Sequence, residues 1–272
     1  MNYLQFDFET ETLQQMEQLI ALLNEQGFEG FEEEGHYLKA FIPENKFDAV
    51  EFSLLLDKFA DIIYTQTTVE HINWNQKWEE DFKPVIVDEF VGIRAHFHPP
   101  IAGCLYEIII TPKMSFGTGH HATTHLMIQQ MRSIDFAGKK VLDFGTGTGI
   151  LAILADKKGA LSVLAVDYDE WSITNTIENL NQNNSQNVRV EKYDAVPMNE
   201  KFDIILANIN LNVILSNLEA IVKVVKPGAQ ILLSGFLKEN EDEMGAALAH
   251  SGLEHLHSAA KGDWMVMVAK KI

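Results

Sequence analysis

The stretch KVLDFGTGTGIL, residues 140–151, decides the fold class of this chain of 272 residues. Its first five residues form an apolar run typical of a buried strand, the glycines indicate a tight turn, and Ile150 begins a helical pattern. Glycine lets the backbone approach a ligand closely and adopt dihedral angles that other residues avoid. The stretch therefore predicts a strand, a ligand-binding turn and a helix in an α/β domain.

The spacing of these glycines indicates which ligand the turn accepts. A dinucleotide-binding turn carries glycine at its first, third and sixth positions, whereas the sixth position counted from Gly145 is Ile150. Asp143 precedes the turn, and a carboxylate there would repel a pyrophosphate but suit a cationic ligand. S-adenosyl-L-methionine carries a sulfonium and an ammonium group and no phosphate. The turn favours S-adenosyl-L-methionine as the cofactor. The alternative is a nicotinamide-dependent oxidoreductase, which would have the same kind of fold.

Polar residues follow three further predicted strands. Asp167 ends the run VLAVD and could accept hydrogen bonds from both hydroxyls of a ribose. Asp194 follows a third strand and could accept from an adenine amino group, although a solvated loop carboxylate is an equally good interpretation. Asn208 ends the fourth strand, which begins at Phe202. Because the carboxyl ends of parallel strands meet at one edge, we expect these side chains to surround one ligand.

The order of elements predicts two domains. Residues 1–70 read as strand, helix, two strands, helix and strand, which is the order of a ferredoxin-like α+β unit. The segment 71–83 carries three large aromatic residues at helical spacing and predicts a connecting helix. After residue 140, strands and helices alternate, which predicts a mostly parallel sheet covered on both faces. The expected second domain is 84–272.

Charge limits the classes of partner. The formal net charge is −18, and residues 1–70 hold 15 Asp and Glu against 3 Lys and Arg. Such a surface repels nucleic acid and suits a basic protein, although solubility is the simpler explanation of the charge taken alone. We therefore expect no direct binding of nucleic acid.

Composition indicates an intracellular protein. Cys104 is the only cysteine, and no stretch is apolar enough to span a bilayer. No cluster of His, Cys and Asp has the spacing of metal ligands, and the pair His120-His121 is too little to bind a metal. We expect a cytoplasmic monomer without a membrane segment or a metal.

A second signature precedes the glycine turn. The segment TPKMSFGTGHHATT, residues 111–124, resembles the signature AFGTGxHPTT of the PrmA-type enzymes, which are bacterial methyltransferases of ribosomal protein eleven of the large subunit. Ser115 and Ala122 depart from that signature, in which Ala and Pro are usual. Shorter matches to the same family occur at 141–145, 207–209 and 233–235. The order of these motifs makes the resemblance specific from Trp74 onward.

The resemblance implies a fold, a cofactor and a reaction. The fold would be a seven-stranded Rossmann-like methyltransferase domain with an N-terminal ferredoxin-like domain that recognises the substrate. The reaction would be the transfer of methyl groups from S-adenosyl-L-methionine to lysine side-chain and/or N-terminal amino groups of a basic ribosomal protein. The cofactor contacts of the family carry over to Thr124, Gly145, Asp167 and Asn208. We add Gly147 and Asp194 to these from the turn and the third strand.

Catalysis of this reaction depends mainly on positioning, because methyl transfer is an in-line attack by a neutral amine. At pH 7 a lysine of pKa about 10.4 gives up its proton at a cost of about 4.6 kcal/mol. We expect Phe116 to contribute an apolar site that lowers this pKa by desolvation, and Asn208 to orient the amine. His121 could relay the departing proton, or it could pin the loop by a hydrogen bond.

The nearer alternative is a methyltransferase acting on another protein, on nucleic acid or on a glutamine amide. Net charge disfavours nucleic acid, and residues 208–211 read NINL rather than the Asn-Pro-Pro-Tyr run that suits an amide or a nucleobase.

Overall fold

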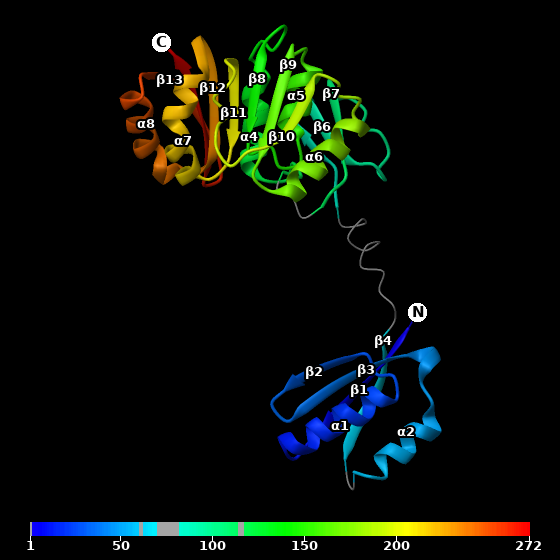
Figure 1. The fold of residues 1–272 in the computed structure, drawn as a ribbon. Coiled ribbons are helices and arrows are strands. Elements are labelled where there is room, and N and C mark those ends of the chain that lie inside the picture. Colours follow the sequence, from blue (N-terminus) through cyan, green and yellow to red (C-terminus); the bar gives the residue numbers. More distant parts are fainter. Residues whose placement is uncertain (1, 60–61, 70–81, 114–116) are drawn as a thin grey trace. The chain divides into compact units, whose positions relative to one another are not determined.

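The computed structural model describes residues 2–59, 62–69, 82–113 and 117–272, and the chain divides into two compact units, 1–81 and 82–272. Helices and strands of both units are labelled in Figure 1. The buried apolar residues of the first unit form one cluster, and those of the second unit form two. The connecting helix expected at 71–83 falls almost entirely outside the described residues, so it stays a prediction.

The N-terminal unit contains the expected order of elements. Its four strands form one antiparallel sheet in the order β2-β3-β1-β4. Alternate residues of β1 are buried, and Phe6 and Phe8 pack with residues of both helices in one core. Both helices therefore cover the same face of the sheet. The elements are β1 (Tyr3–Glu9), α1 (Leu13–Glu25), β2 (Gly30–Glu34), β3 (Tyr37–Pro43), a 3₁₀ turn (Glu44–Lys46), α2 (Ala49–Leu56) and β4 (Ile63–Val69).

The second unit is built on a seven-stranded sheet in the order β10-β9-β8-β11-β12-β14-β13. The strands β10, β9, β8, β11 and β12 pair in parallel, whereas β14 is antiparallel to both of its neighbours. The expected seven-stranded, mostly parallel Rossmann-like sheet is thus confirmed. The strands are β8 (Lys140–Phe144), β9 (Ser162–Asp167), β10 (Val188–Lys192), β11 (Phe202–Asn208), β12 (Val225–Leu237), β13 (Leu253–Lys261) and β14 (Trp264–Lys271).

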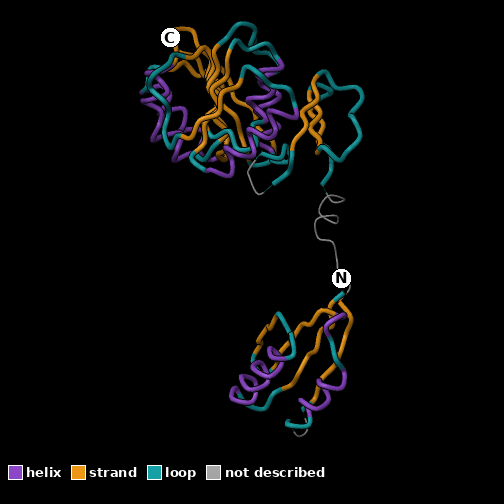
Figure 2. The backbone as a smooth tube through the Cα atoms, turned by 45° about the vertical axis from the view of Figure 1, so that its right-hand side comes forward, coloured by secondary structure: helices purple, strands orange, loops and turns teal. Residues whose placement is uncertain are grey.

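Helices cover both faces of this sheet (Figure 2). Val141 and Leu142 are neighbours in β8 but belong to two separate cores, because successive side chains of a strand point to opposite faces. One core contains residues of α4, α5 and α6, and the other contains residues of α7 and α8. The helices are α4 (Ala122–Met131), α5 (Ile150–Lys157), α6 (Glu170–Gln182), α7 (Leu211–Val224) and α8 (Glu241–His250), with a 3₁₀ turn at Lys238–Asn240. None of the helices within the described ranges is long and apolar enough to cross a membrane.

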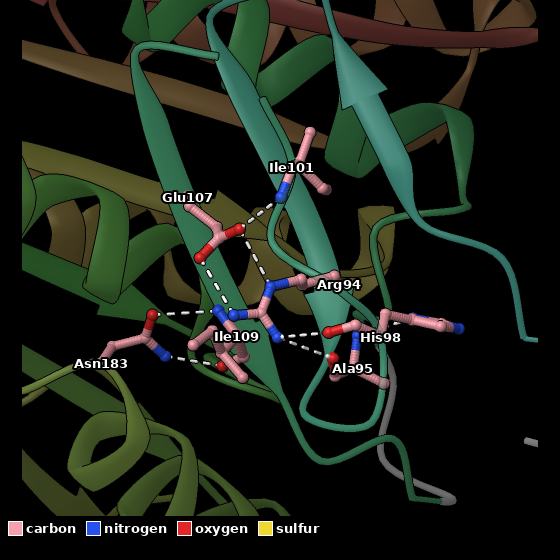
Figure 3. A network of polar contacts seen from close by, with 7 residues as sticks. All are labelled: Arg94, Ala95, His98, Ile101, Glu107, Ile109 and Asn183. Carbon is pink, nitrogen blue, oxygen red and sulfur yellow. Dashed lines mark hydrogen bonds and ion pairs between the residues drawn. The ribbon is translucent and has the colours of Figure 1, made fainter. Parts of the chain in front are cut away.

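A separate three-stranded sheet precedes the large one. It consists of β5 (Val85–Val87), β6 (Val91–Ala95) and β7 (Tyr106–Ile110), in that order. A partly buried ion pair links β6 to β7, since Arg94 Nε donates to Glu107 Oε1 over 2.9 Å, and the N–H of Ile101 donates to the same oxygen over 2.7 Å (Figure 3). The loop between β6 and β7, which contains His98, Pro99 and Pro100, is therefore fastened to β7.

Candidate active site

A cavity of about 450 Å³ opens at the carboxyl ends of β8, β9 and β11. The strand order reverses between β8 and β11, and open α/β sheets bind their ligands at such a switch point. A second cavity, of about 490 Å³, includes Pro227 and Gly228 and lies at the amino ends of the strands, so we assign the site to the first. The first cavity is lined by His121, Thr123, Gly145, Gly147, Asp167, Tyr168, Asp169, Ser172, Asn208, Ile209, Asn210, Gly235 and Trp264.

The glycine turn between β8 and α5 needs its glycines for two reasons. Gly145, Gly147 and Gly149 all have positive φ angles, of 78°, 57° and 83°. A Cβ atom on Gly145 would also lie 3.0 Å from Cδ1 of Ile209, and one on Gly149 would lie 2.9 Å from Cγ2 of Thr176. Backbone atoms of the turn therefore face the cavity directly, as the sequence predicts.

Asp167, at the end of β9, holds the glycine turn by a hydrogen bond. Its Oδ2 accepts from the N–H of Gly147 over 2.9 Å, and its Oδ1 accepts from the N–H of Asp169 over 3.1 Å. The residue is only 8% exposed, and it lines the cavity. Because each carboxylate oxygen has more than one acceptor position, Asp167 can still accept from two hydroxyl groups.

Asn208 lines the cavity and carries an unsatisfied acceptor. Its Nδ2 donates to Oγ1 of Thr124 over 3.4 Å, and its Oδ1 is buried with no hydrogen-bond partner within the described residues. Thr124, which lies in α4, is buried behind Asn208 and does not line the cavity itself. A buried acceptor of this kind costs free energy unless a ligand supplies the donor.

The signature loop joins this site through Gly117 and His121. The carbonyl of Gly117 accepts from Oγ1 of Thr148 over 2.5 Å. His121 is the N-cap of α4, its Nδ1 accepts from the N–H of Thr123 over 3.3 Å, and its ring packs on Trp264 with centroids 4.6 Å apart. These contacts favour the pinning role for His121. Its role as a proton relay stays a prediction, and Phe116 lies outside the described residues.

Two acidic residues are placed differently from the rest. Asp194 is exposed after β10 and is not among the residues that line the cavity. Asp143 is fully buried beneath the turn, where Oγ1 of Thr146 donates to its Oδ2 over 2.7 Å. The sequence argument that Asp143 presents its charge to the ligand was therefore wrong, and Asp167 and Asp169 are the acidic residues that line the cavity.

Burial also changes the chemistry of Asp143. Removal from water raises the pKa of Asp143 to about 7, the hydrogen bond from Thr146 and the backbone N–H of Ala152 oppose this rise, and the charge of Asp167 adds to it. One oxygen of the carboxyl group, Oδ1, has no hydrogen-bond partner among the described residues. Near neutral pH the group therefore exists in both protonation states.

Several residues that line the cavity were not among the predicted site residues, and Trp264, Ile209 and Gly235 are three of them. Trp264 reaches it because β14 runs antiparallel to β12 and begins at the same edge of the sheet. Ile209 and Gly235 touch each other, and a Cβ atom on Gly235 would lie only 2.2 Å from the carbonyl oxygen of Ile209. The short motifs at 207–209 and 233–235 were the available signal for Ile209 and Gly235.

The cavity fits a cationic nucleoside. The glycine backbone allows a ligand to approach closely, and Asp167 supplies acceptors for a ribose and a negative charge for a cation. Hydrogen-bond donors for a pyrophosphate are not the main feature of the cavity. Together with the seven-stranded sheet, this site defines the class of S-adenosyl-L-methionine-dependent methyltransferases. The model of one family within that class, "Ribosomal protein L11 methyltransferase (PrmA)", matches residues 5–272. The chain belongs to this family.

Comparisons with individual proteins agree with the family. A curated relative from Bacteroides thetaiotaomicron, named ribosomal protein L11 methyltransferase, is 36% identical over an alignment of 275 positions that covers 97% of this chain and 98% of the relative. A relative of the same name from Porphyromonas gingivalis is 37% identical and covers 92% of this chain and 88% of its own. The crystal structure of ribosomal protein L11 methylase from Lactobacillus delbrueckii subsp. bulgaricus matches with a TM-score of 0.65 and 27% identity, over 70% of this chain and 100% of that one.

Proposed function

We propose that this protein transfers methyl groups from S-adenosyl-L-methionine to amino groups of ribosomal protein L11, on lysine side chains, the N-terminus or both. The family and the names of relatives that match nearly the whole chain support this substrate. Asp167 and the backbone of Gly145 and Gly147 would hold the adenosyl part of the cofactor, since they line one side of the cavity. When bound, the cofactor supplies a methyl carbon activated by a sulfonium.

The unpaired Oδ1 of Asn208 is the observation on which the proposed amine chemistry rests. A neutral amine has N–H donors, and one of them would satisfy this oxygen while the nitrogen lone pair stays free to attack. An amide oxygen suits this task better than a carboxylate, because a full negative charge would favour the unreactive ammonium. Ile209 and Trp264 add apolar surface, which lowers the pKa of a lysine by desolvation.

Thr124 would orient the amide of Asn208, since its Oγ1 accepts from Nδ2. This contact leaves the amide oxygen, and not the nitrogen, available to the amine. The proton that the amine loses before the attack would pass to solvent or to His121, which lines the same cavity.

We further propose that the N-terminal unit is a ferredoxin-like substrate-recognition domain. The order of its elements and of its strands supports the fold. Its surplus of acidic residues supports a basic partner, and Glu32, Glu33 and Glu34 are exposed in succession on the edge strand β2. The expected cytoplasmic location and monomeric state belong to the same proposal.

The experiment is a transfer assay with methyl-labelled S-adenosyl-L-methionine, purified L11 and, in a parallel reaction, ribosomal RNA. We expect label in L11 and none in the RNA, and mass spectrometry of the labelled peptides would identify the methylated amines. Label in RNA, or on glutamine amides, would replace this proposal by its nearest alternative.

Asn208 variants test the amine chemistry separately. We expect Asn208→Ala to lower kcat by about 10- to 100-fold while the Kd of the cofactor changes little, because the lost contact is made to the amine. Asn208→Gln, which keeps the amide but moves it, would restore part of kcat only if the pocket adjusts. A variant that weakens cofactor binding and leaves kcat intact would place Asn208 against the cofactor instead.

A further inference from the structure

Four side chains of the helix α6 form hydrogen bonds with one residue of the signature segment, residues 111–124. That residue is Thr111, which directly follows β7. Its N–H donates to Oδ1 of Asn179 over 2.8 Å, and its carbonyl accepts from Nδ2 of Asn175 over 3.0 Å. Its hydroxyl donates to Glu178 over 3.0 Å and accepts from Gln182 over 2.5 Å. Every polar group of Thr111 is thus paired with a side chain of one helix.

Asn179 also holds the glycine turn. Its Nδ2 donates to the carbonyl of Thr148 over 2.8 Å, and its side chain is completely buried. Thr148 lies between Gly147 and Gly149, and its hydroxyl donates to the carbonyl of Gly117. Asn179 and Thr148 together therefore tie the signature segment at Thr111 and at Gly117 to the turn that faces the cavity.

Neither Asn179, Thr148 nor Thr111 lines the cavity, so any effect on the cofactor must pass through the turn. The route is short. Gly147, the residue before Thr148, donates its N–H to Asp167, and its carbonyl accepts from Oγ1 of Thr176 over 2.8 Å. A shift of Thr148 would therefore move the backbone that contacts Asp167.

We propose that Asn179 is a positioning residue of the cofactor site. Its amide is a rigid group that offers one acceptor to Thr111 and one donor to Thr148, and it holds the two segments in a single arrangement. Without it, an N–H and a carbonyl would lose their partners in the interior, and the turn would move to satisfy them. The inference rests on the cofactor of this family and not on the identity of the methyl acceptor.

Asn183 provides a matched control on the same helical face, one turn further along the chain. Its Oδ1 accepts from the N–H of Ile109 over 3.0 Å, and its Nδ2 donates to the carbonyl of Ile109 over 2.6 Å (Figure 3). Asn183 thus clamps β7 by the same kind of paired bond, and it is also buried. No hydrogen bond of its side chain reaches the glycine turn within the described residues.

The experiment measures the Kd of S-adenosylhomocysteine by calorimetry, and the denaturant midpoint, for the full chain and three variants. We expect Asn179→Ala to raise Kd by about tenfold, equivalent to about 1.4 kcal/mol, and Asn183→Ala to change it less than about twofold. Both should lower the midpoint. Asn179→Asp keeps the acceptor for Thr111 but repels the carbonyl of Thr148, so the Kd should rise as it does in Asn179→Ala. This variant replaces Asn179→Ala in the test if the alanine variant does not fold.

Hydrogen exchange gives a second readout, which needs no cofactor. The amide proton of Gly147 should exchange faster in Asn179→Asp than in Asn183→Ala, because only the first loses the support of the turn. Equal changes of Kd in the Asn179 and Asn183 variants would reduce the role of Asn179 to general stability and overturn the inference. Failure of the unmodified chain to bind S-adenosylhomocysteine would contradict the cofactor assignment instead.

Discussion

The N–H of Gly147 donates a hydrogen bond of 2.9 Å to Oδ2 of Asp167, although Gly147 lies in the turn after β8 and Asp167 is the last residue of β9. The bond joins the glycine turn after β8 to the end of β9, so the two sides of the cavity form one unit. The position of the glycine turn therefore depends on Asp167, and the position of Asp167 depends on the turn.

Asp167→Asn should weaken binding of S-adenosylhomocysteine by about 10- to 100-fold, because charge-assisted bonds worth roughly 1.5–3 kcal/mol are lost. The new amide nitrogen would also face the N–H of Gly147 or of Asp169, both of which need an acceptor. Calorimetry checks the affinity. Asp203→Asn is the control, because Asp203 pairs with Lys226 at the opposite ends of the strands and should leave the affinity unchanged. An equal loss in both variants would contradict a direct role for Asp167.

Gly235→Ala should destabilise the protein and damage the cavity together. Its φ is 102°, and the added Cβ would lie 2.2 Å from the carbonyl oxygen of Ile209. Gly228→Ala is matched, since Gly228 is in the same strand with a φ of 79° but has no atom within 4 Å of an added Cβ. We expect a loss of about 1–2 kcal/mol for Gly228→Ala, from backbone strain alone, and a larger one for Gly235→Ala. Denaturant unfolding measures both, and similar losses would show that the contact with Ile209 relaxes freely.

Asp143 should make the free energy of unfolding fall as pH rises. Its folded pKa of about 7 lies above the ordinary value of 3.8, so the folded state binds the proton more tightly than the unfolded state. Its contribution is complete below pH 3.8 and is lost progressively as pH rises to about 7. Between pH 5 and pH 8, the wild type should lose about 2–3 kcal/mol relative to Asp143→Asn, which cannot titrate.

The measurement for Asp143 is denaturant unfolding of both proteins at several pH values. Other groups titrate equally in the two proteins, so the difference between their curves isolates this one group. Parallel curves would mean that Asp143 is ionised in the folded state throughout this range.

The acidic N-terminal surface should steer a basic substrate. We expect Glu32→Gln, Glu33→Gln and Glu34→Gln together to raise the KM for L11 by roughly threefold or more at low salt and to reduce its dependence on salt. The control variant neutralises Glu241, Asp242 and Glu243, which are also exposed and lie on α8. It removes the same amount of charge as the variant of β2. If both triple variants raised KM alike, net charge rather than the surface at β2 would be responsible.

Much of the site was predictable because it is encoded locally. Gly145, Gly147, Asp167 and Asn208 each follow a strand, and the ends of parallel strands meet at one edge of a sheet. Asp194 follows a strand by the same rule, but it is exposed and lies outside the cavity lining. The rule identifies the edge and does not say which side chains turn inward.

The sequence by itself determined the elements, the parallel sheet and the class of ligand, because the period of apolar residues and the position of glycines depend only on near neighbours along the chain. Only the tertiary structure decided that Trp264 packs on His121, that Asn179 joins Thr111 to Thr148, and that Asp143 is buried beneath the turn. The contacts of Trp264 and Asn179 join residues far apart in the chain, and the burial of Asp143 depends on which elements pack over the turn. Such arrangements exist only once the sheet has ordered its strands and the helices have packed on it.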